Sequence, residues 1–464
     1  MKNTNPSSSY FDKVAPEWDI MRTGYFTESV REAAIHKAYL HPDMIVADVG
    51  AGTGFIAAGL APLVKHVHVL DGSAAMLDEA RRNLAQFDNV EFHEADGLSL
   101  PLPDASVDVV FANMYLHHCP DPLAAIREMV RILRSAGRLV ITDMDAHAHE
   151  WLKTEMADLW LGFDRGQIRE WFEQAELVNV IADCTGESCQ ADCKSSEGER
   201  ADISIFVAAG SKRVRMRESV QEAYAAQAQG GGCGCSDSSC CSPGLIQLED
   251  VGTVNWNSNY SAGEMSEIPS EAAEISLGCG NPIAMAELKP GETVLDIGSG
   301  GGIDVFLAAR RVSPAGFVYG IDMTPAMLQR ARKAAKKGGY TNVKFRHGYA
   351  EKLPVKDGEI DVIISNCVIN LTEDKAKVFG EAYRALKEGG RLEVNDVVFG
   401  GPVMPEVRTF AVGWSECVSG ALYEAEYVDL VKQAGFKDIR VRRSTSSGVS
   451  DEVEVYSVQV SAIK

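Results

Sequence analysis

Two glycine-rich segments, each beginning with an acidic residue, are the first places where this sequence could do chemistry. The pattern D-x-G-x-G-x-G occupies residues 48–54 and again residues 296–302. Each copy follows a short β-branched run that predicts a strand, and each precedes a helical segment. Such a turn lets a ligand approach backbone N–H groups at a helix N-terminus. Because the acid would repel a pyrophosphate but attract an ammonium group, the pattern favours a ligand with a cationic amino-acid tail.

A second acid ends the next predicted strand in each copy, Asp71 in the first and Asp322 in the second. A carboxylate at that position can accept both hydroxyls of a ribose. Together the two acids predict a ligand that carries an amino-acid part and a nucleoside part. The alternative is that the glycines serve only close packing of helix against strand.

Cysteines are concentrated in the second half of the chain. Of the eleven in the sequence, Cys279 precedes the first predicted strand of that half, Cys367 ends its fourth, and Cys417 follows its fifth. Thiolates are soft ligands, so we expect these cysteines to bind a soft metal or metalloid if their side chains converge. Two alternatives remain open. Any of the three cysteines could fill the core, and zinc usually takes four ligands with local C-x₂₋₄-C pairs, which these three lack.

The whole strand pattern is repeated. Residues 107–113 match residues 360–366, and residues 137–143 match residues 390–396. Alternation of strands and helices predicts a parallel sheet covered by helices. We therefore expect an α/β protein with two tandem Rossmann-like domains, joined by a Gly/Ser/Cys-rich linker. The predicted boundaries are 1–211 for the first domain, 212–260 for a helix and the linker, and 261–464 for the second domain.

Composition excludes several classes of partner. The formal net charge is −21, which disfavours nucleic acid and anionic membrane surfaces. No apolar run is long enough to span a bilayer, and the polar, Ser-rich start lacks a signal-peptide core. A cytoplasmic location is expected, where the cysteines would be reduced.

The duplicated acid and glycine pattern resembles that of class I S-adenosylmethionine (SAM)-dependent methyltransferases. The resemblance implies that one set of second-copy residues would bind SAM: the methionine part along the glycine-rich turn, the ribose at Asp322, and the adenine beside Met323 and Glu351. That set is Asp296, Gly298, Ser299, Gly300, Gly302, Asp322, Met323, Glu351 and Asn366. The first-copy counterparts are Asp48, Gly50, Gly52, Asp71 and Asp96.

The amino-acid sequence around these cysteines is similar to that of arsenite methyltransferases over about residues 212–440. Residues 277–282, 365–371 and 416–422 carry this likeness. By this resemblance, Cys279, Cys367 and Cys417 bind trivalent arsenic as substrate, and Cys240 or Cys241 forms a redox-active disulfide. It also implies SAM as methyl donor, arsenite and methylated arsenicals as substrates, and an external thiol reductant, thioredoxin or glutathione. Departures from the family leave open which methylated product dominates.

The first copy has different chemistry at the corresponding places. Met114 stands where Cys367 stands in the second copy. Cys119 follows two histidines, and Cys184, Cys189 and Cys193 fall in a predicted late loop, where they could grip a metalloid or be exposed thiols. Two other functions stay open for the protein. The second domain could methylate an organic acceptor, or the chain could bind metalloids without catalysis.

Overall fold

The computed structural model describes residues 6–193, 200–228, 260–273, 280–409, 418–450 and 453–464. Its internal contacts define two units. The first comprises Met1–Val214 with Met404–Glu406, and the second comprises Arg215–Val403 with Val407–Lys464. Among the described residues, no helix has both the length and the apolar character needed to cross a membrane.

The first unit contains a seven-stranded sheet in the order β3-β2-β1-β4-β5-β7-β6. Strands β1 to β5 run parallel, whereas β7 lies antiparallel between β5 and β6. Strands β2 and β3 therefore follow on one side of β1, and the chain then crosses back so that β4 and the later strands follow on the other side. The strand bounds are β1 (Ile45–Val49), β2 (His66–Asp71), β3 (Val90–Glu94), β4 (Val107–Asn113), β5 (Leu133–Met144), β6 (Leu177–Asp192) and β7 (Arg200–Lys212).

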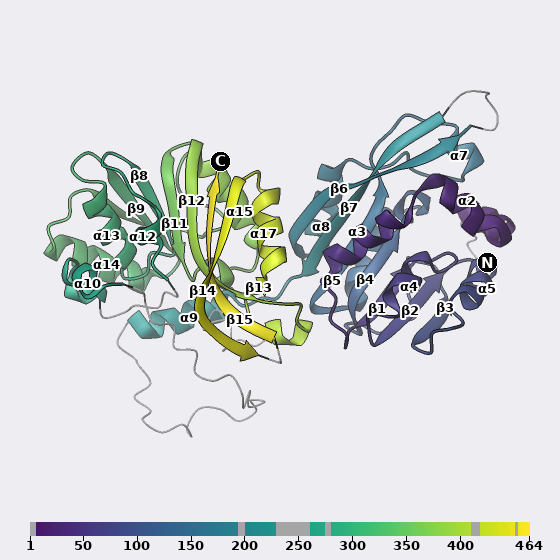
Figure 1. The fold of residues 1–464 in the computed structure, drawn as a ribbon, viewed down its shortest axis with the longest axis horizontal. Coiled ribbons are helices and arrows are strands. Elements are labelled where there is room, and N and C mark those ends of the chain that lie inside the picture. The colour runs from purple at the N-terminus through teal and green to yellow at the C-terminus, as the bar shows by residue number, and fades with distance from the viewer. Residues whose placement is uncertain (1–5, 194–199, 229–259, 274–279, 410–417, 451–452) are drawn as a thin grey trace, which may run out of the picture. The chain divides into compact units, whose positions relative to one another are not determined.

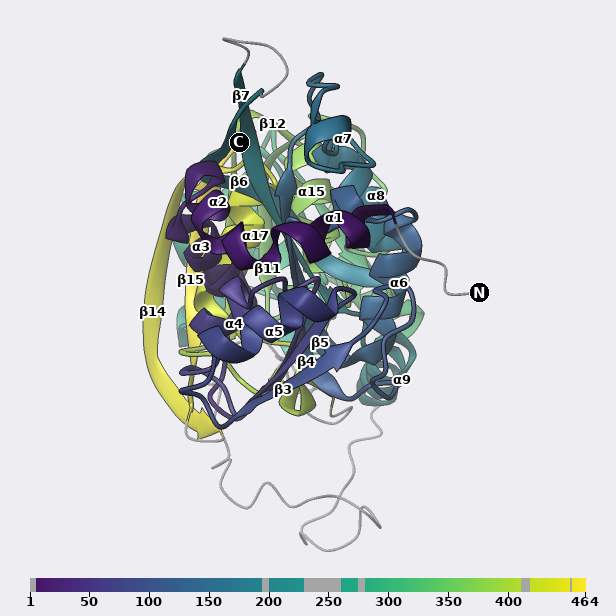
Figure 2. The same cartoon turned by 90° about the vertical axis from the view of Figure 1, so that its right-hand side faces the viewer.

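Helices cover both faces of this sheet (Figures 1 and 2). Neighbouring residues of β7 point to opposite faces. Ile205 packs with Val30 of α3, whereas Phe206 belongs to the core that contains Phe172 of α8. The helix bounds are α1 (Pro6–Val14), α2 (Trp18–Tyr25), α3 (Glu28–Ala38), α4 (Phe55–Leu60), α5 (Ala74–Asn83), α6 (Pro122–Ile132), α7 (Leu152–Glu155) and α8 (Arg165–Gln174), with short 3₁₀ turns η1 (Ala15–Glu17) and η2 (Leu116–His118).

The second unit repeats this topology with the order β10-β9-β8-β11-β12-β15-β14, and β13 pairs with β12. Its strands are β8 (Thr293–Ile297), β9 (Phe317–Asp322), β10 (Val343–His347), β11 (Ile360–Asn366), β12 (Leu386–Phe399), β13 (Leu422–Tyr423), β14 (Lys437–Ser450) and β15 (Val453–Ile463). Its helices are α9 (Arg217–Ala228), α10 (Ala262–Ser266), α11 (Ser270–Ala273), α12 (Pro282–Met285), α13 (Ile303–Arg311), α14 (Pro325–Lys337), α15 (Lys375–Ala385) and α17 (Glu424–Gln433). The 3₁₀ turns are η3 (Ile369–Leu371) and η4 (Pro405–Thr409). The expected pair of Rossmann-like domains is confirmed.

One sequence-based expectation is wrong. Cys184 and Cys189 do not lie in a loop, because both belong to β6, which pairs with β7 along most of its length. A register shift between Cys184 and Ser188 interrupts the ladder, and Gly186 in this stretch has a φ of 83°. Polar residues and a glycine resemble a loop in sequence, and the neighbouring strand supplies the order.

The same charged clamp occurs once in each unit. Arg131 Nη2 lies 2.9 Å from Glu128 Oε1 and also donates to the carbonyl of Leu100 at 3.0 Å. In the second unit, Arg384 Nη2 lies 2.8 Å from Glu381 Oε2 and donates to the carbonyl of Leu353 at 3.2 Å. Each arginine thus fastens the segment before β4 or β11 to the helix that follows that strand.

We expect Arg131→Met and Arg384→Met each to lower the free energy of unfolding of its own unit by about 1–3 kcal/mol. Each substitution removes charge-assisted hydrogen bonds and leaves backbone carbonyls without their donor. Urea denaturation of the full chain, followed by circular dichroism, measures the change. Arg82→Met, which alters an exposed i,i+3 pair with Glu79, is the control and should change stability by less than about 0.5 kcal/mol.

Candidate active sites

A pocket of the second unit opens at the carboxyl ends of β8 to β11. Strands β8 and β11 are neighbours in the sheet, although β9 and β10 come between them in the chain. Open α/β sheets bind ligands at such a reversal of strand order. The predicted residues that line this pocket are Asp296, Gly298, Ser299, Gly300, Asp322, Met323, Glu351, Asn366 and Cys367. Gly302 instead forms the N-cap of α13, with a φ of 97°.

Asp322 fixes the glycine-rich turn. Its Oδ2 accepts the N–H of Gly300 at 2.9 Å, and its Oδ1 accepts the N–H of Thr324 at 2.7 Å. A Cβ on Gly298 would lie 2.3 Å from the Val368 side chain, whereas a Cβ on Gly300 would meet nothing within 4 Å. The space above Gly300 is therefore open to a ligand. Each Asp322 oxygen retains lone-pair capacity for a further donor, such as a ribose hydroxyl.

Three acids, Asp296, Asp304 and Asp322, line this pocket, and the first two are buried. Burial raises the pKa of Asp296 well above its ordinary value, and the carboxyl groups of Asp304 and Asp322 raise that pKa further. Burial also raises the pKa of Asp304, whose Oδ1 accepts from the Tyr260 hydroxyl at 2.7 Å. A cationic group in the pocket would favour the ionised carboxylates and so lower these pKa values. The sequence analysis did not assign a role to Asp304, because its contact with Tyr260 joins residues 44 positions apart.

Cys367 occupies a strained position at the end of β11. Its φ is 56°, and its N–H donates to the carbonyl of Asn395 at 2.8 Å. Its side chain is 4% exposed and lines the pocket. Left-handed backbone at a residue other than glycine concentrates at functional sites. The sulfur is disulfide-bonded in this structure, whereas the other described cysteines, Cys119, Cys184, Cys189 and Cys193, form no disulfide.

The remaining predicted cysteines, Cys240, Cys241, Cys279 and Cys417, lie outside the described residues. Asn366, however, makes two hydrogen bonds to the backbone of Gly280. The Gly280 N–H donates to Asn366 Oδ1 at 3.2 Å, and Asn366 Nδ2 donates to the Gly280 carbonyl at 2.8 Å. A Cβ on Gly280 would lie 2.5 Å from the Asn395 side chain, so only glycine fits there. Convergence of the three thiols stays a prediction.

Helix α9 covers another part of the same pocket. Arg217 Nη2 lies 2.8 Å from Glu351 Oε1, and Gln221 Nε2 donates to the Met323 carbonyl at 3.0 Å. Arg217 and Tyr224 both line the pocket. The sequence analysis predicted this helix but not its role, because its polar residues carry no recognisable motif.

The first unit has an equivalent pocket, and Asp48, Gly50, Gly52, Asp71 and Asp96 all line it. Asp71 repeats the arrangement of Asp322, since its Oδ2 accepts the Gly52 N–H and its Oδ1 accepts the Ser73 N–H, both at 2.8 Å. Burial raises the pKa of Asp48 to about 7, although a hydrogen bond from the Ala57 N–H opposes that rise. Both units therefore present a buried acid beside a glycine-rich turn.

Several aromatic side chains also line the first pocket. A T-shaped contact of Phe11 with His118 forms part of its wall. His117, next in the chain, is held by Asp143, whose Oδ1 lies 2.7 Å from Nδ1. No described cysteine lines this pocket. Its remaining wall residues include Trp18, Arg22, Phe26, Phe55, Met114 and Tyr115.

The cysteines of β6 are poor candidates for a metalloid site. Cys184 is exposed and Cys193 is buried, and burial raises the pKa of the Cys189 thiol to about 12. A thiol with so high a pKa rarely becomes the thiolate that binds a metalloid. Within the described residues, these three cysteines do not form a close ligand group.

The donor set of both pockets fits SAM. The buried acid matches the ammonium and sulfonium charges, the strand-end acid matches the ribose hydroxyls, and the open space above the turn matches the methionine chain. These matches rest on Asp296, Asp322 and Gly300 in the second unit.

Comparison with known proteins agrees with this geometry. A methyltransferase-domain family model matches residues 288–435, and another matches residues 47–141. This chain is similar to the arsenite methyltransferase of Halobacterium salinarum, with 40% identity over 233 residues that cover 48% of this chain and 58% of that protein. It is also 40% identical to the human arsenite methyltransferase over 181 residues, which cover 37% of this chain and 48% of that protein.

Among solved structures, an arsenic(III) S-adenosylmethionine methyltransferase from Chlamydomonas reinhardtii is 36% identical, with a TM-score of 0.40. The match covers 44% of this chain and 72% of that one. The chain spans about half the length of the curated relatives above. The fold and the two domain matches define a protein with two class I SAM-dependent methyltransferase domains. Over about half of its length, the chain is similar to arsenite methyltransferases.

Asp48 generates a pH-dependent prediction. Pairing with the SAM ammonium needs the carboxylate, but a pKa of about 7 leaves Asp48 largely protonated at lower pH. Binding must then displace a proton, so the SAM affinity of the first unit should fall by up to about tenfold for each pH unit below 7 and level off above it. Isothermal titration of the full chain carrying Asp322→Asn, which weakens the second site, measures this affinity.

The matched control adds Asp48→Asn to that chain. This variant should bind SAM weakly and with little dependence on pH. An affinity in the parent chain that stays constant from about pH 6 to about pH 8 would show that Asp48 does not meet the ammonium.

Proposed function

We propose that the second unit transfers methyl groups from SAM to trivalent arsenic held by the thiolates of Cys279, Cys367 and Cys417, so that the protein detoxifies arsenite. The observation that carries the proposal is the position of Cys367, which lines the same pocket as Asp296 and Gly300. Similarity of the chain to arsenite methyltransferases supports the choice of substrate.

The neighbours of two of these cysteines support their convergence. Asn366 precedes Cys367, Gly280 follows Cys279, and Asn366 and Gly280 are joined by two hydrogen bonds. Asn395 contacts both segments, since its carbonyl accepts from the Cys367 N–H and its side chain faces Gly280. Among the described residues, neither amide atom of the buried Asn395 side chain has a hydrogen-bond partner. A polar substrate group near Cys367 would give that amide a partner.

The chain's residues would act mainly by positioning. Each thiol loses its proton as an As–S bond replaces an As–O bond, and water leaves. Arsenic bound by three sulfurs keeps a lone pair, which the pocket would hold in line with the donor carbon. Bound SAM supplies an electrophilic methyl group on a sulfonium centre. The acids Asp296 and Asp304 would favour binding of that cation.

An external thiol reductant belongs to this proposal. The Cys367 sulfur is disulfide-bonded here, and a disulfide cannot offer a thiolate. Two electrons from thioredoxin or glutathione would restore the thiols by thiol–disulfide exchange. Methylation oxidises arsenic, so the same donor would return it to the trivalent state, with Cys240 or Cys241 as the proposed relay.

Matched aspartate variants assign the activity to one unit. Asp322→Asn should reduce methylated arsenic formation at least about hundredfold, because it removes the carboxylate that fixes the turn and faces the ribose. Asp71→Asn, the same change in the first unit, should leave this activity within about twofold. Full-length protein, arsenite, SAM with a labelled methyl group and a thiol reductant suffice for the assay. Loss of activity with Asp71→Asn alone would contradict the assignment.

Cysteine variants test the ligand set. Cys367→Ser and Cys417→Ser should each abolish methylation of every arsenic species while SAM affinity changes little. Cys279→Ser should stop methylation of arsenite but spare monomethylated substrate, which needs one ligand fewer. Wild-type turnover by Cys367→Ser would refute the thiolate site. Tight arsenite binding by the wild type without any product would instead identify a metalloid-binding protein.

For the first unit, we propose methylation of an organic acceptor. The aromatic residues Phe11, Trp18 and Tyr115 beside its SAM-type turn favour an apolar or aromatic molecule. A screen of small aromatic acceptors on the Asp322→Asn chain, coupled to hydrolysis of the product S-adenosylhomocysteine, tests this, and turnover should disappear when Asp71→Asn is added.

A further inference from the structure

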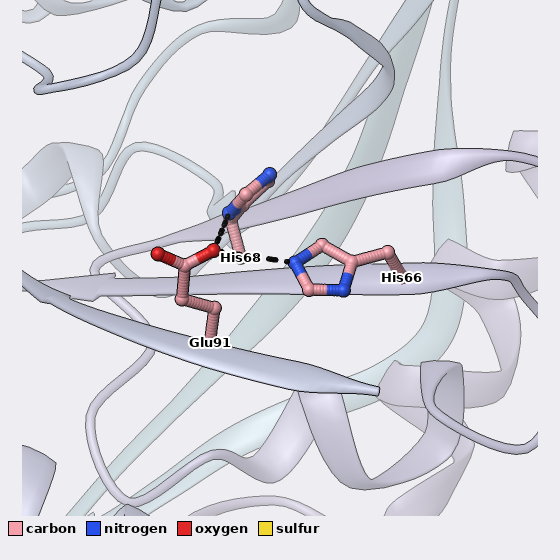
Figure 3. A group of neighbouring side chains, drawn as sticks. All are labelled: His66, His68 and Glu91. Atoms are coloured by element: carbon pink, nitrogen blue, oxygen red, sulfur yellow. Dashed lines mark ion pairs between the residues drawn. The ribbon is translucent and has the colours of Figure 1, made fainter. Parts of the chain in front are cut away.

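His66 and His68 of β2 lie beside Glu91 of β3 in the first unit (Figure 3), and His93 of β3 lies next to His68. His66 Nε2 and His68 Nδ1 lie 3.5 and 3.6 Å from the same oxygen of Glu91, Oε2. His93 Nε2 lies 3.7 Å from the other Glu91 oxygen and 3.1 Å from His68 Nδ1. The ligand atoms of His66, His68 and Glu91 all lie within 4.8 Å of one another.

The register of the two parallel strands explains this cluster. His68 lies opposite Glu91, and Leu70 lies opposite His93. Since alternate residues of a strand share a face, His66 and His68 project from the same face as Glu91 and His93. The side chains are 31% exposed at His66, 15% at His68 and 17% at His93. Water and ions therefore reach the cluster, although the strands hold it in place.

Imidazole and carboxylate ligands at these separations suit a borderline divalent cation. In a tetrahedral zinc site with bonds of about 2.0–2.1 Å, neighbouring ligand atoms lie about 3.3 Å apart. The distances from the shared Glu91 oxygen to His66 and His68, 3.5 and 3.6 Å, are close to that spacing. We propose that His66, His68 and Glu91 form a Zn²⁺-binding site of the first unit, with His93 Nε2 beside it at 3.1 Å from His68 Nδ1. Hard cations such as Mg²⁺ prefer all-oxygen sites and would not bind here.

The second unit shows that the fold does not need histidines at these positions. Thr293 pairs with Phe317 as Ile45 pairs with His66, and Tyr319 pairs with Lys344 as His68 pairs with Glu91. There the face carries a ring contact between Phe317 and Tyr319, with Arg346 over the Tyr319 ring at 4.2 Å. The four equivalent positions, Phe317, Tyr319, Lys344 and Arg346, thus carry aromatic and cationic side chains in place of the histidines and glutamate.

The location indicates a structural role. β3 is the edge strand of the first sheet, and His66 and Glu91 lie near the amino ends of β2 and β3. The SAM-type pocket lies at the opposite ends, where Asp71 and Glu94 contribute to it. A cation shared by two strands would fasten the edge strand to its neighbour. Methyl transfer would not need it.

A matched exchange provides the test. The variant His66→Phe/His68→Tyr/Glu91→Lys/His93→Arg carries the second unit's residues at these four positions, so the sheet should still form. Both full-length proteins are reduced and alkylated first, because the eleven cysteines would otherwise capture zinc. Isothermal titration with Zn²⁺ should give one more bound ion per chain in the wild type than in the variant, and Mg²⁺ should give none. Co²⁺ should produce tetrahedral visible absorption in the wild type only.

Single substitutions keep the test decisive if the exchange variant does not fold. His68→Phe and Glu91→Gln should each lower Zn²⁺ affinity more than about tenfold, whereas SAM binding should stay unchanged. Zn²⁺ should also raise the Tm of the wild type but not that of His68→Phe. Equal zinc stoichiometry in wild type and exchange variant, or a His68→Phe affinity within about twofold of wild type, would overturn the proposal.

Discussion

A hydrogen bond from a glycine N–H to a strand-end carboxylate organises each half of this protein. Gly300 donates to Asp322 in one half and Gly52 donates to Asp71 in the other. The bond holds the glycine-rich turn in a left-handed backbone conformation that favours glycine. The position of this turn sets where the following helix begins. The carboxylate has a second set of lone pairs that points to the pocket. One side chain therefore shapes the site and also belongs to it.

Each site also contains a buried acid, Asp48 in the first unit and Asp296 in the second. The raised pKa values of Asp48 and Asp296 show that desolvation penalises their ionised forms. A cationic ligand removes part of that penalty, so ligand binding and protein stability are linked. The net charge of −21 also favours cationic ligands over phosphates. The acids thereby select the ligand as well as binding it.

The sequence predicted the elements governed by local pattern. Asp48 and Asp296 follow β-branched runs, and their spacing to the glycines was enough to place the turns. It did not reveal the roles of Arg217 or Asp304, because each depends on a contact between distant segments. The β6 strand was missed for a related reason, since its order comes from pairing with β7 and not from its own residues. The cysteine geometry also depends on tertiary packing, and Cys279 and Cys417 lie outside the described residues.

The end of the fourth strand has the same backbone in both units. Cys367 has a φ of 56° and Met114 a φ of 49°, and each N–H is held by a carbonyl of the neighbouring strand, that of Asn395 or that of Thr142. The kink is thus maintained by the sheet and does not depend on which side chain it presents. A protein built on this frame can acquire a new acceptor chemistry by exchanging one residue there, without redesigning the donor site beside it.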